Sequence, residues 1–335
     1  MNQITVLGAG SWGSTLAQVL ADAGNNVLLW GRNRALVDEI NHSHTNSTYL
    51  PGIILPEQLR ATDDSEEAFA YSRTYVLAIP AQSLRPRLEE WKGALGGNAT
   101  IISTLKGIEV STHMRMTEVI VEVLEIDPAQ VAIITGPNLS SELALRQPAA
   151  AVAAAPNEEL AHRVQRLFTT PYYRVYTSLD VVGCEMAGAV KSVIALGVGI
   201  AVGLDLGENT QAMLITRGLN EVARLGAAHG ADPLSAAGLA GMGDLVASCS
   251  SPLSRNRTFG EALGRGGTME YASTHVAKTV EGVASAGAVV ELAHRVGVEV
   301  PVIEAVADVV SGMITPTQAL ERLMEISTRS EDFIK

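Results

Sequence analysis

The feature that most constrains the fold is a glycine-rich segment close to the N-terminus. Residues 4–7 read as a short apolar strand that runs directly into residues 8–13, which have the pattern G-x-G-x-x-G. Residues 15–23 have the apolar spacing of an amphipathic helix, and residues 27–30 form a second apolar run. A strand, a helix and a strand within about 30 residues make a βαβ unit, the context in which this pattern binds dinucleotides.

Each glycine of the pattern has its own physical role. Gly8 permits a tight turn, Gly10 lets a pyrophosphate approach the backbone, and Gly13 lets the helix pack closely on the strand. The helix N-terminus then presents N–H groups and a partial positive charge to the anion. An ordinary glycine-rich turn is the alternative interpretation, and the complete βαβ context favours dinucleotide binding.

The end of the second strand indicates which dinucleotide is preferred. A site selective for NAD usually carries Asp or Glu there, to hold the ribose 2′-hydroxyl. This chain has Arg32 and Arg34 and no carboxylate in residues 30–34. Two guanidinium groups suit a 2′-phosphate, so the segment favours NADP over strict NAD, with a solvated basic turn as the alternative.

Composition narrows the class of protein. A length of 335 residues suggests two domains, and 47% hydrophobic residues supply both cores. The net charge of −12 argues against a nucleic-acid partner. Cys184 and Cys249 form no C-x-x-C motif, and the seven His residues lie in no ligand cluster, so neither a disulfide nor a metal site is expected. Reduced thiols, and a first strand with no signal peptide before it, predict a cytoplasmic location.

The order of elements predicts an α/β protein with a Rossmann-type doubly wound, mostly parallel sheet, followed by an all-α C-terminal domain. Strand signals at residues 74–79, 100–103 and 131–135 alternate with helical patterns at 84–91 and 112–124. Further strand signals at 149–155 and 174–177 flank a helical pattern at 157–168, and from about residue 179 the pattern is helical throughout. We therefore expect a dinucleotide-binding domain over residues 1–180 and a helical substrate-binding and catalytic domain over 181–335.

Residues 186–204 are apolar except for Lys191 and Ser192, so they pass as a transmembrane helix by length. Such a span would bury the Lys191 ammonium and would lack basic flanks. We therefore expect no membrane span here but a core helix. It also carries a G-x-x-x-G at Gly199 and Gly203, a pattern known from membrane helices. The glycine-rich helices of the second domain are compatible with a buried intersubunit face, as in a homodimer.

Three polar features of the second half suggest chemistry. Lys191 must snorkel, pair or react, because it lies in an apolar helix. Asp244 stands at a predicted helix start, where an N-cap is the structural alternative. Ser254, Arg255 and Asn256, followed by Arg257, form a compact donor cluster suited to a phosphate, with a basic surface turn as the alternative.

Seven motifs occur in order along the chain: residues 8–13 with Ser11-Trp12, Lys106-Gly107, Gly136-Pro137, Ala189-Val190-Lys191, residues 241–244, residues 254–257 and Val280-Glu281-Gly282. Together they resemble those of the prokaryotic-type NAD(P)-dependent glycerol-3-phosphate dehydrogenases over essentially the whole chain. The resemblance implies reversible reduction of dihydroxyacetone phosphate to sn-glycerol 3-phosphate, a phospholipid precursor, with NADP or NAD as cofactor. One departure is Leu139-Ser140, where the family commonly has an aromatic residue and then Ala.

The resemblance also implies roles for individual residues. Lys191 would donate and accept the proton, with Lys106 and Asp244 beside it as the other catalytic residues. The small phosphorylated substrate would contact Lys106, Gly136, Asn138, Lys191, Asp244, Ser254, Arg255 and Asn256. The cofactor would contact Gly8, Gly10, Ser11, Trp12, Gly13, Arg32, Tyr49, Lys106, Ser140, Arg255, Thr279 and Glu281.

The chemistry agrees with these residue types. Hydride transfer to a ketone leaves negative charge on the carbonyl oxygen, which the Lys191 ammonium can stabilise and then protonate. A second cation at Lys106 would lower the pKa of Lys191, and Asp244 would oppose that shift. A reductase of another hydroxy or keto acid, a non-catalytic nucleotide sensor and a methyltransferase are the alternatives. The donor cluster at 254–256 distinguishes the expected enzyme from a reductase of another acid. A role for Lys191 distinguishes it from a sensor, and the arginines at 32 and 34 distinguish it from a methyltransferase.

Overall fold

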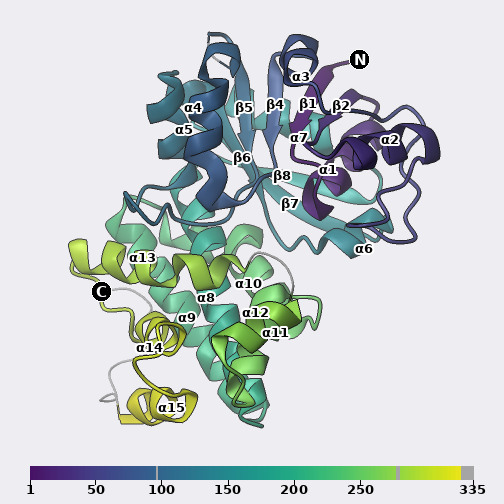
Figure 1. Ribbon diagram of the computed structural model, residues 1–335. Coiled ribbons are helices and arrows are strands. Elements are labelled where there is room, and N and C mark those ends of the chain that lie inside the picture. Colours follow the sequence, from purple (N-terminus) through teal and green to yellow (C-terminus); the bar gives the residue numbers. More distant parts are fainter. Residues whose placement is uncertain (96, 277–279, 326–335) are drawn as a thin grey trace. The chain divides into compact units, whose positions relative to one another are not determined.

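The computed structural model describes residues 1–95, 97–276 and 280–325 (Figure 1). The chain forms two compact units. The first, which we call the sheet unit, contains Met1–Leu105 and Met116–Val181. The second, the helical unit, contains Lys106–Arg115 and the described chain from Val182 onward. The sequence suggested a single boundary near residue 180, and the structure in addition groups the ten residues of Lys106–Arg115 with the helices.

The sheet unit contains eight strands in the order β3-β2-β1-β4-β5-β6-β7-β8. All neighbours are parallel except β6 and β7, so the predicted doubly wound, mostly parallel sheet is confirmed. The order reverses between β1 and β4, the place where such sheets bind ligands. The strands are β1 (Gln3–Leu7), β2 (Asn26–Trp30), β3 (Arg60–Thr62), β4 (Thr74–Leu77), β5 (Thr100–Ser103), β6 (Val131–Thr135), β7 (Ala149–Ala154) and β8 (Tyr173–Ser178).

Helices cover both faces of this sheet because successive strand side chains point to opposite sides. Ile4 and Val6 of β1 join one buried cluster with Leu16 of α1. Thr5, between them, faces the other side and donates to the carbonyl oxygen of Ala68 in α3 at 2.9 Å. The helices of the unit are α1 (Ser11–Asp22), α2 (Arg34–Ser43), α3 (Ser65–Tyr71), α4 (Leu84–Leu95), α5 (Met116–Leu124), α6 (Ser140–Ala144) and α7 (Glu158–Phe168).

One predicted helix is shorter than the sequence pattern suggested. Residues 112–124 have helical spacing, but α5 begins only at Met116. The preceding residues fold into a tight hairpin, closed by a backbone bond from Glu109 N to the Met114 carbonyl oxygen at 2.9 Å. Thr112 and His113 are therefore part of the segment that packs with the helical unit.

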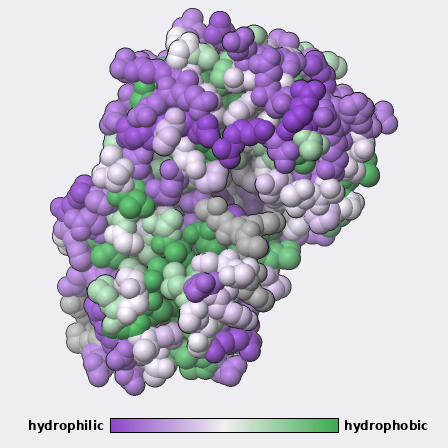
Figure 2. Space-filling model, in the orientation of Figure 1, coloured by the Kyte–Doolittle hydropathy of each residue, from purple (hydrophilic) through white to green (hydrophobic). Residues whose placement is uncertain are grey.

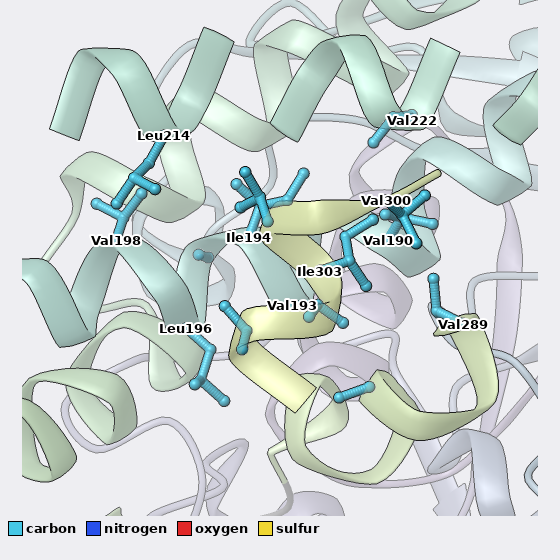
Figure 3. Close-up of a cluster of buried hydrophobic side chains, with 14 of the residues drawn as sticks. Val190, Val193, Ile194, Leu196, Val198, Leu214, Val222, Val289, Val300 and Ile303 are labelled. Carbon is cyan, nitrogen blue, oxygen red and sulfur yellow. The ribbon is translucent and has the colours of Figure 1, made fainter. Parts of the chain in front are cut away.

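The helical unit is built around α8 (Val181–Gly203), whose apolar side chains form the centre of its core (Figure 3). α8 is long and apolar enough to cross a membrane, but 20 of its 23 residues are buried, so it packs as a core helix. The other helices are α9 (Glu208–Ala228), α10 (Asp244–Ser250), α11 (Arg255–Gly264), α12 (Met269–Val276), α13 (Glu281–Arg295), α14 (Pro301–Val310) and α15 (Pro316–Glu325). A 3₁₀ turn at Pro233–Ala237 and a π-helical turn at Leu239–Gly243 join α9 to α10.

The G-x-x-x-G of α8 serves packing within the chain. A Cβ added to Gly199 would lie 2.0 Å from the Arg257 carbonyl oxygen, and one added to Gly203 would lie 2.3 Å from that of Glu261. Both carbonyls belong to α11, so this glycine face of α8 is covered by α11. The two glycines therefore allow close approach between helices of the same chain.

In the view of Figure 2, hydrophilic side chains dominate the sheet unit and hydrophobic ones gather over the helical unit.

Candidate active site

Lys191 lies in α8 and is buried, with a relative exposure of 8%. Its Nζ donates to Oδ1 of Asp244 at 2.7 Å and to the hydroxyl oxygen of Ser248 at 2.5 Å. A snorkelling lysine would reach solvent instead. The interpretation of Lys191 as a snorkelling side chain is therefore wrong, and its ammonium is held among polar partners in the interior.

Asp244 is the first residue of α10, directly after the π-helical turn. Its carboxylate makes no cap bond, because the N-cap position belongs to Gly243. Oδ2 of Asp244 instead accepts from Nζ of Lys106 at 2.5 Å, while Oδ1 accepts from Lys191. One buried carboxylate thus lies between two ammonium groups, and the cluster carries a net positive charge.

Burial decides the electrostatics of this cluster. Desolvation lowers the pKa of Lys191 from its usual 10.5 to about 8, Asp244 opposes the shift, and Lys106 adds to it. The sequence suggested the two opposing charge effects but not their balance. Cys249, also buried beside the cluster, has its pKa raised to about 12 by desolvation and so stays a neutral thiol.

Ser248 belongs to this cluster although no sequence motif pointed to it. It lies four residues after Asp244 on the same short helix, so both side chains point to the same face. The spacing Asp-x-x-x-Ser next to a predicted buried lysine was the available signal. The Ser248 hydroxyl fixes the direction of the Lys191 ammonium together with Asp244.

The donor cluster at 254–257 forms the N-terminus of α11. Ser254 is the N-cap and accepts from Arg257 N at 3.4 Å. The side-chain oxygen of Asn256 accepts from Gly282 N at 2.9 Å, which leaves the Asn256 amide NH₂ as the donor end of the side chain. Arg255 keeps contact with solvent, but partial desolvation of its guanidinium lowers its pKa, and the charge of Glu281 opposes that shift. The cluster is therefore more than a surface turn, because it adds side-chain donors to a helix N-terminus, an arrangement that suits an anion.

In the sheet unit, the glycine-rich segment has the geometry its motif predicts. Gly8 has φ +125°, and a Cβ added to Gly13 would lie 1.7 Å from the Gly8 carbonyl oxygen. A Cβ on Gly10, in contrast, would meet no atom within 4 Å, so the space above Gly10 is open. The completely buried Asn46 holds this turn, donating to the Ala9 carbonyl oxygen at 3.1 Å and to Ser14 at 2.8 Å. Asn46 gave no signal in the sequence, because it lies in a polar segment without a recognisable pattern.

A second loop of the sheet unit lies against the glycine-rich turn. The Ser140 hydroxyl forms a hydrogen bond of 2.8 Å with the Ser11 hydroxyl, so Ser140 is at the motif although the family commonly has Ala there. Gly136 has φ +148° and approaches Ala151 so closely that an added Cβ would lie 2.9 Å from its Cα. Both polar atoms of the Asn138 amide are buried and have no hydrogen-bond partner among the described residues. An unpartnered buried amide is costly, which points to a ligand at Asn138.

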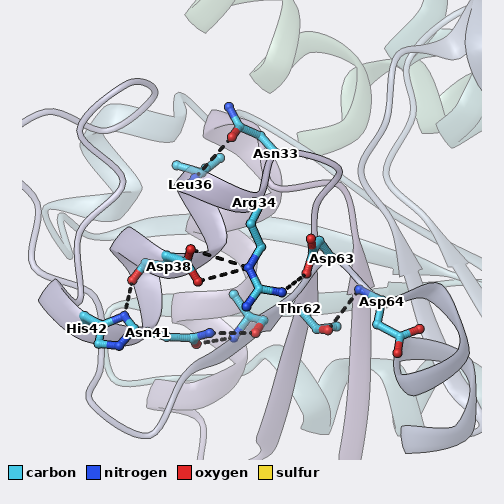
Figure 4. Close-up of polar contacts among 10 residues, drawn as sticks. Asn33, Arg34, Leu36, Asp38, Asn41, His42, Thr62, Asp63 and Asp64 are labelled. Carbon is cyan, nitrogen blue, oxygen red and sulfur yellow. Dashed lines mark hydrogen bonds and ion pairs between the residues drawn. The ribbon is translucent and has the colours of Figure 1, made fainter.

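The two arginines after β2 are not equivalent. Arg34 is held by two carboxylates (Figure 4), with 2.9 Å from Nη1 to Asp63 Oδ1 and 3.2 Å from Nε to Asp38 Oδ1. Its guanidinium is thus bonded to two carboxylates while its side chain stays exposed, so we expect Arg34 to contribute less to a 2′-phosphate site than Arg32. Arg32 is exposed at the end of β2 and is the remaining guanidinium at this position.

The other predicted site residues are placed as follows. Trp12 is half-buried in the first turn of α1, Tyr49 is 38% exposed after α2, and Glu281 begins α13. Thr279 lies outside the described residues. Within residues 1–95, 97–276 and 280–325, no group of three or more His, Cys, Asp or Glu residues could hold a metal ion.

Comparison with known proteins agrees with this geometry. Models of the N-terminal and C-terminal parts of NAD-dependent glycerol-3-phosphate dehydrogenase match residues 3–161 and 180–321. Glycerol-3-phosphate dehydrogenase (NAD(P)+) of Streptomyces coelicolor is 51% identical over 326 residues, 97% of each chain. The chain belongs to the NAD-dependent glycerol-3-phosphate dehydrogenase family. It is therefore an oxidoreductase that uses NAD or NADP.

Further members of the family are similar over their full length. The glycerol-3-phosphate dehydrogenase (NAD(P)+) of Corynebacterium glutamicum strain R is 52% identical over 99% of this chain and 100% of that protein. The crystal structure of glycerol-3-phosphate dehydrogenase from Coxiella burnetii matches with a TM-score of 0.91 at 34% identity. It covers 97% of this chain and 99% of that one, so the similarity includes both the sheet unit and the helical unit.

Proposed function

We propose that this protein interconverts dihydroxyacetone phosphate and sn-glycerol 3-phosphate, and that it supplies glycerol 3-phosphate for phospholipid synthesis. The observation that carries the proposal is the buried cluster of Lys191, Asp244 and Lys106, in which one lysine has a pKa of about 8. A general acid is most effective when its pKa lies near the pH at which it works, and a lysine pKa of about 8 lies near that pH. Family membership adds the nicotinamide chemistry to this acid.

In the reduction, Lys191 acts on the carbonyl oxygen of the substrate. A dinucleotide held at the glycine-rich turn would supply the hydride for the new C–H bond. Electrons of the C=O π bond move to oxygen, where the Lys191 ammonium stabilises the developing charge and transfers one proton. Asp244 and Ser248 hold the direction of the ammonium, and Lys106 adds positive charge beside the oxygen. Oxidation of glycerol 3-phosphate uses the same groups in reverse, with neutral Lys191 as the base.

The substrate phosphate is assigned to the N-terminus of α11. Arg255 supplies a charged fork, Asn256 an oriented amide NH₂, and Ser254 a hydroxyl. Binding energy at the phosphate, remote from the reacting carbon, is then used to orient the carbonyl. Gly136 and Asn138 are proposed as further substrate contacts, since the Asn138 amide is buried without a partner among the described residues.

The dinucleotide fits the glycine-rich turn. The open space above Gly10 and the N–H groups at the start of α1, which no side chain caps, suit a pyrophosphate. We assign Gly8, Gly13, Ser11 and Ser140 to the same site, because they belong to this turn or are hydrogen-bonded to it. Trp12, Arg32, Tyr49, Lys106, Arg255, Thr279 and Glu281 complete the proposed cofactor contacts.

The decisive test is loss of NADPH absorbance with dihydroxyacetone phosphate, run beside NADH and beside a Lys191→Ala variant. We expect oxidation in the wild type and a loss of roughly 100-fold or more in kcat for Lys191→Ala with unchanged cofactor binding. Lys92→Ala is the matched control, because Lys92 is an exposed lysine paired with Glu125 on the sheet unit. NADPH binding without oxidation would show that dihydroxyacetone phosphate is not the substrate. Full activity of Lys191→Ala would show that Lys191 is not the general acid.

Three broader expectations stay proposals. Cys184 and Cys249 are buried and form no disulfide with each other, which supports a reducing, cytoplasmic location. The net charge of −12 supports small-molecule rather than nucleic-acid partners. A homodimer is the proposed assembly, and sedimentation velocity measures it directly.

A further inference from the structure

Lys106 reaches Asp244 from a segment that interrupts the sheet unit in sequence but belongs to the helical unit. Residues Lys106–Arg115 follow β5 and precede α5, both in the sheet unit, yet the segment itself packs with the helical unit. It brings one of the two cations of the cluster to the helices that carry the other. What holds this segment on the helical unit therefore also holds Lys106 next to Asp244.

The segment is internally rigid. An antiparallel bridge joins Ile108 to Arg115, and Glu109 N donates to the Met114 carbonyl oxygen at 2.9 Å. The Thr112 hydroxyl donates to the Glu109 carboxylate at 2.5 Å across the turn. We call residues 106–115 the Lys106 hairpin. Because its two ends are bonded to each other, a movement at Arg115 is transmitted to Ile108 and on to Lys106.

In addition to the Lys106–Asp244 bond, Ile108 and Arg115 contact the helical core. Ile108 is completely buried in the same cluster as the apolar side chains of α8. Arg115 Nη1 lies 2.8 Å from Oε2 of Glu185, with side-chain exposures of 15% and 2%. Glu185 is on α8, six residues before Lys191, which is about 9 Å along the helix axis. The ion pair therefore ties the hairpin to the helix that carries the proposed acid.

A buried ion pair adds little net stability compared with an apolar pair of the same size, because both charges lose their hydration. Its contribution is directional, since a guanidinium and a carboxylate bond only in a narrow range of orientations. The apolar packing of Ile108 prescribes no direction by itself. The ion pair adds an orientation-dependent contact at the other end of the hairpin.

We propose that the Arg115–Glu185 ion pair positions the Lys106 hairpin on α8, so that Lys106 stays bonded to Asp244 beside Lys191. The two residues act on the reaction through Lys106 and are positioning residues. The inference rests on the proposed function, because Lys106 and Lys191 are the groups proposed to act on the substrate oxygen.

The expected consequence follows from the charges around Lys191. The groups that face it are Asp244, Ser248 and Cys249 of α10 and Lys106 of the hairpin. If Lys106 moves away, Lys191 loses a positive neighbour and Asp244 loses a competing partner. Both changes raise the pKa of Lys191, so the pH at which the ammonium loses its proton moves upward.

The test uses Glu185→Gln, which keeps the shape and removes the charge, and Arg115→Lys, which keeps the charge and removes the fork. In Glu185→Gln we expect kcat for the reduction to fall by about 10- to 100-fold, as for a catalytic group displaced by about 1 Å. The high-pH limb of kcat in Glu185→Gln should move to higher pH. For Arg115→Lys, both kcat and the position of this limb should lie between those of Glu185→Gln and the wild type. Arg322→Met is the control, because it removes a pair of 2.6 Å to Asp308 in the same unit, away from the hairpin.

The outcomes separate this inference from the proposed function. A folded Glu185→Gln protein with wild-type kcat and an unmoved pH limb overturns the positioning role. If Glu185→Gln does not fold, the same two observations on Arg115→Lys overturn it. A wild type without activity on dihydroxyacetone phosphate overturns the proposed function instead. In that case the side-chain NMR titration of Lys191, assigned with Lys191→Met, tests the positioning role: its midpoint must rise in Glu185→Gln, and an unchanged midpoint rejects the inference.

Discussion

The ammonium of Lys191 lies 2.7 Å from Oδ1 of Asp244, yet burial outweighs this contact and the pKa of Lys191 falls to about 8. The folded protein therefore releases this proton at a lower pH than the unfolded chain, whose lysines titrate near 10.5. Holding the charged form at neutral pH costs stability, as is common for groups kept for function.

This difference predicts how stability changes with pH. Between pH 8 and 10.5 the unfolded chain binds the proton and the folded protein does not, so the Lys191 contribution to the free energy of unfolding rises with pH. The rise is up to about 3 kcal/mol. Lys191→Met should lack it. Urea unfolding of both proteins at the two ends of this window measures the difference, and parallel curves would show that burial does not depress the pKa.

Glu221 predicts a dependence of the opposite sign. Its buried carboxylate accepts from Val302 N at 2.8 Å and from Ile303 N at 3.1 Å, at the start of α14. Desolvation outweighs these bonds and raises the pKa of Glu221 from 4.5 to about 7. The folded protein holds a proton in this window that the unfolded chain releases, so stability falls as pH rises from 4.5 to 7.

The matched variant is Glu221→Gln, which cannot titrate. The free energy of unfolding of the wild type, relative to this variant, should fall by up to about 3 kcal/mol across the window. Glu208→Gln, at an exposed carboxylate in the first turn of α9, is the control for the loss of a carboxylate that is not buried. A Glu221→Gln curve that runs parallel to that of the wild type would contradict the prediction.

The glycine-rich turn predicts different effects for two neighbouring glycines. Gly13→Ala places a Cβ 1.7 Å from the Gly8 carbonyl oxygen, so it should lower stability by about 3 kcal/mol. Gly10→Ala meets open space and should lower stability by less than about 1 kcal/mol. Its methyl group would occupy the proposed pyrophosphate position, so NADPH affinity should fall about tenfold or more. Thermal unfolding measures the two stability effects, and NADPH titration measures the affinity. Tight NADPH binding by Gly10→Ala would show that the pyrophosphate does not bind at this turn.

Arg32 and Arg34 predict a split in cofactor preference. Arg32→Ala should raise KM for NADPH about tenfold, the loss of one charge-assisted hydrogen bond, and leave KM for NADH unchanged. Arg34→Ala should leave the ratio of the two KM values unchanged, because Asp38 and Asp63 already bind its guanidinium. If Arg34→Ala alone lowered the preference for NADPH, the assignment of the 2′-phosphate to Arg32 would be wrong.

Most of the sheet unit was predictable because its signals are local. The strand, glycine turn and helix around Gly8 to Gly13 are neighbours in sequence, and the alternation of strands with helices recurs at short spacing. The same holds for the helical character of the chain after residue 180. Family motifs then indicated Lys106, Lys191 and Asp244 as separate points along the chain.

Tertiary structure alone decided how those points meet. Lys106 and Lys191 are 138 and 53 residues from the carboxylate they share, and no periodicity encodes such a contact. Periodicity also does not encode the ion pair of Arg34 with Asp63 or that of Arg115 with Glu185. Nor does it encode the packing of α11 on the glycines of α8. Local pattern fixes which face of an element is apolar, but the balance of desolvation and charge at a buried group depends on every element packed around it. For that reason the depressed pKa of Lys191 is a property of the folded helical unit.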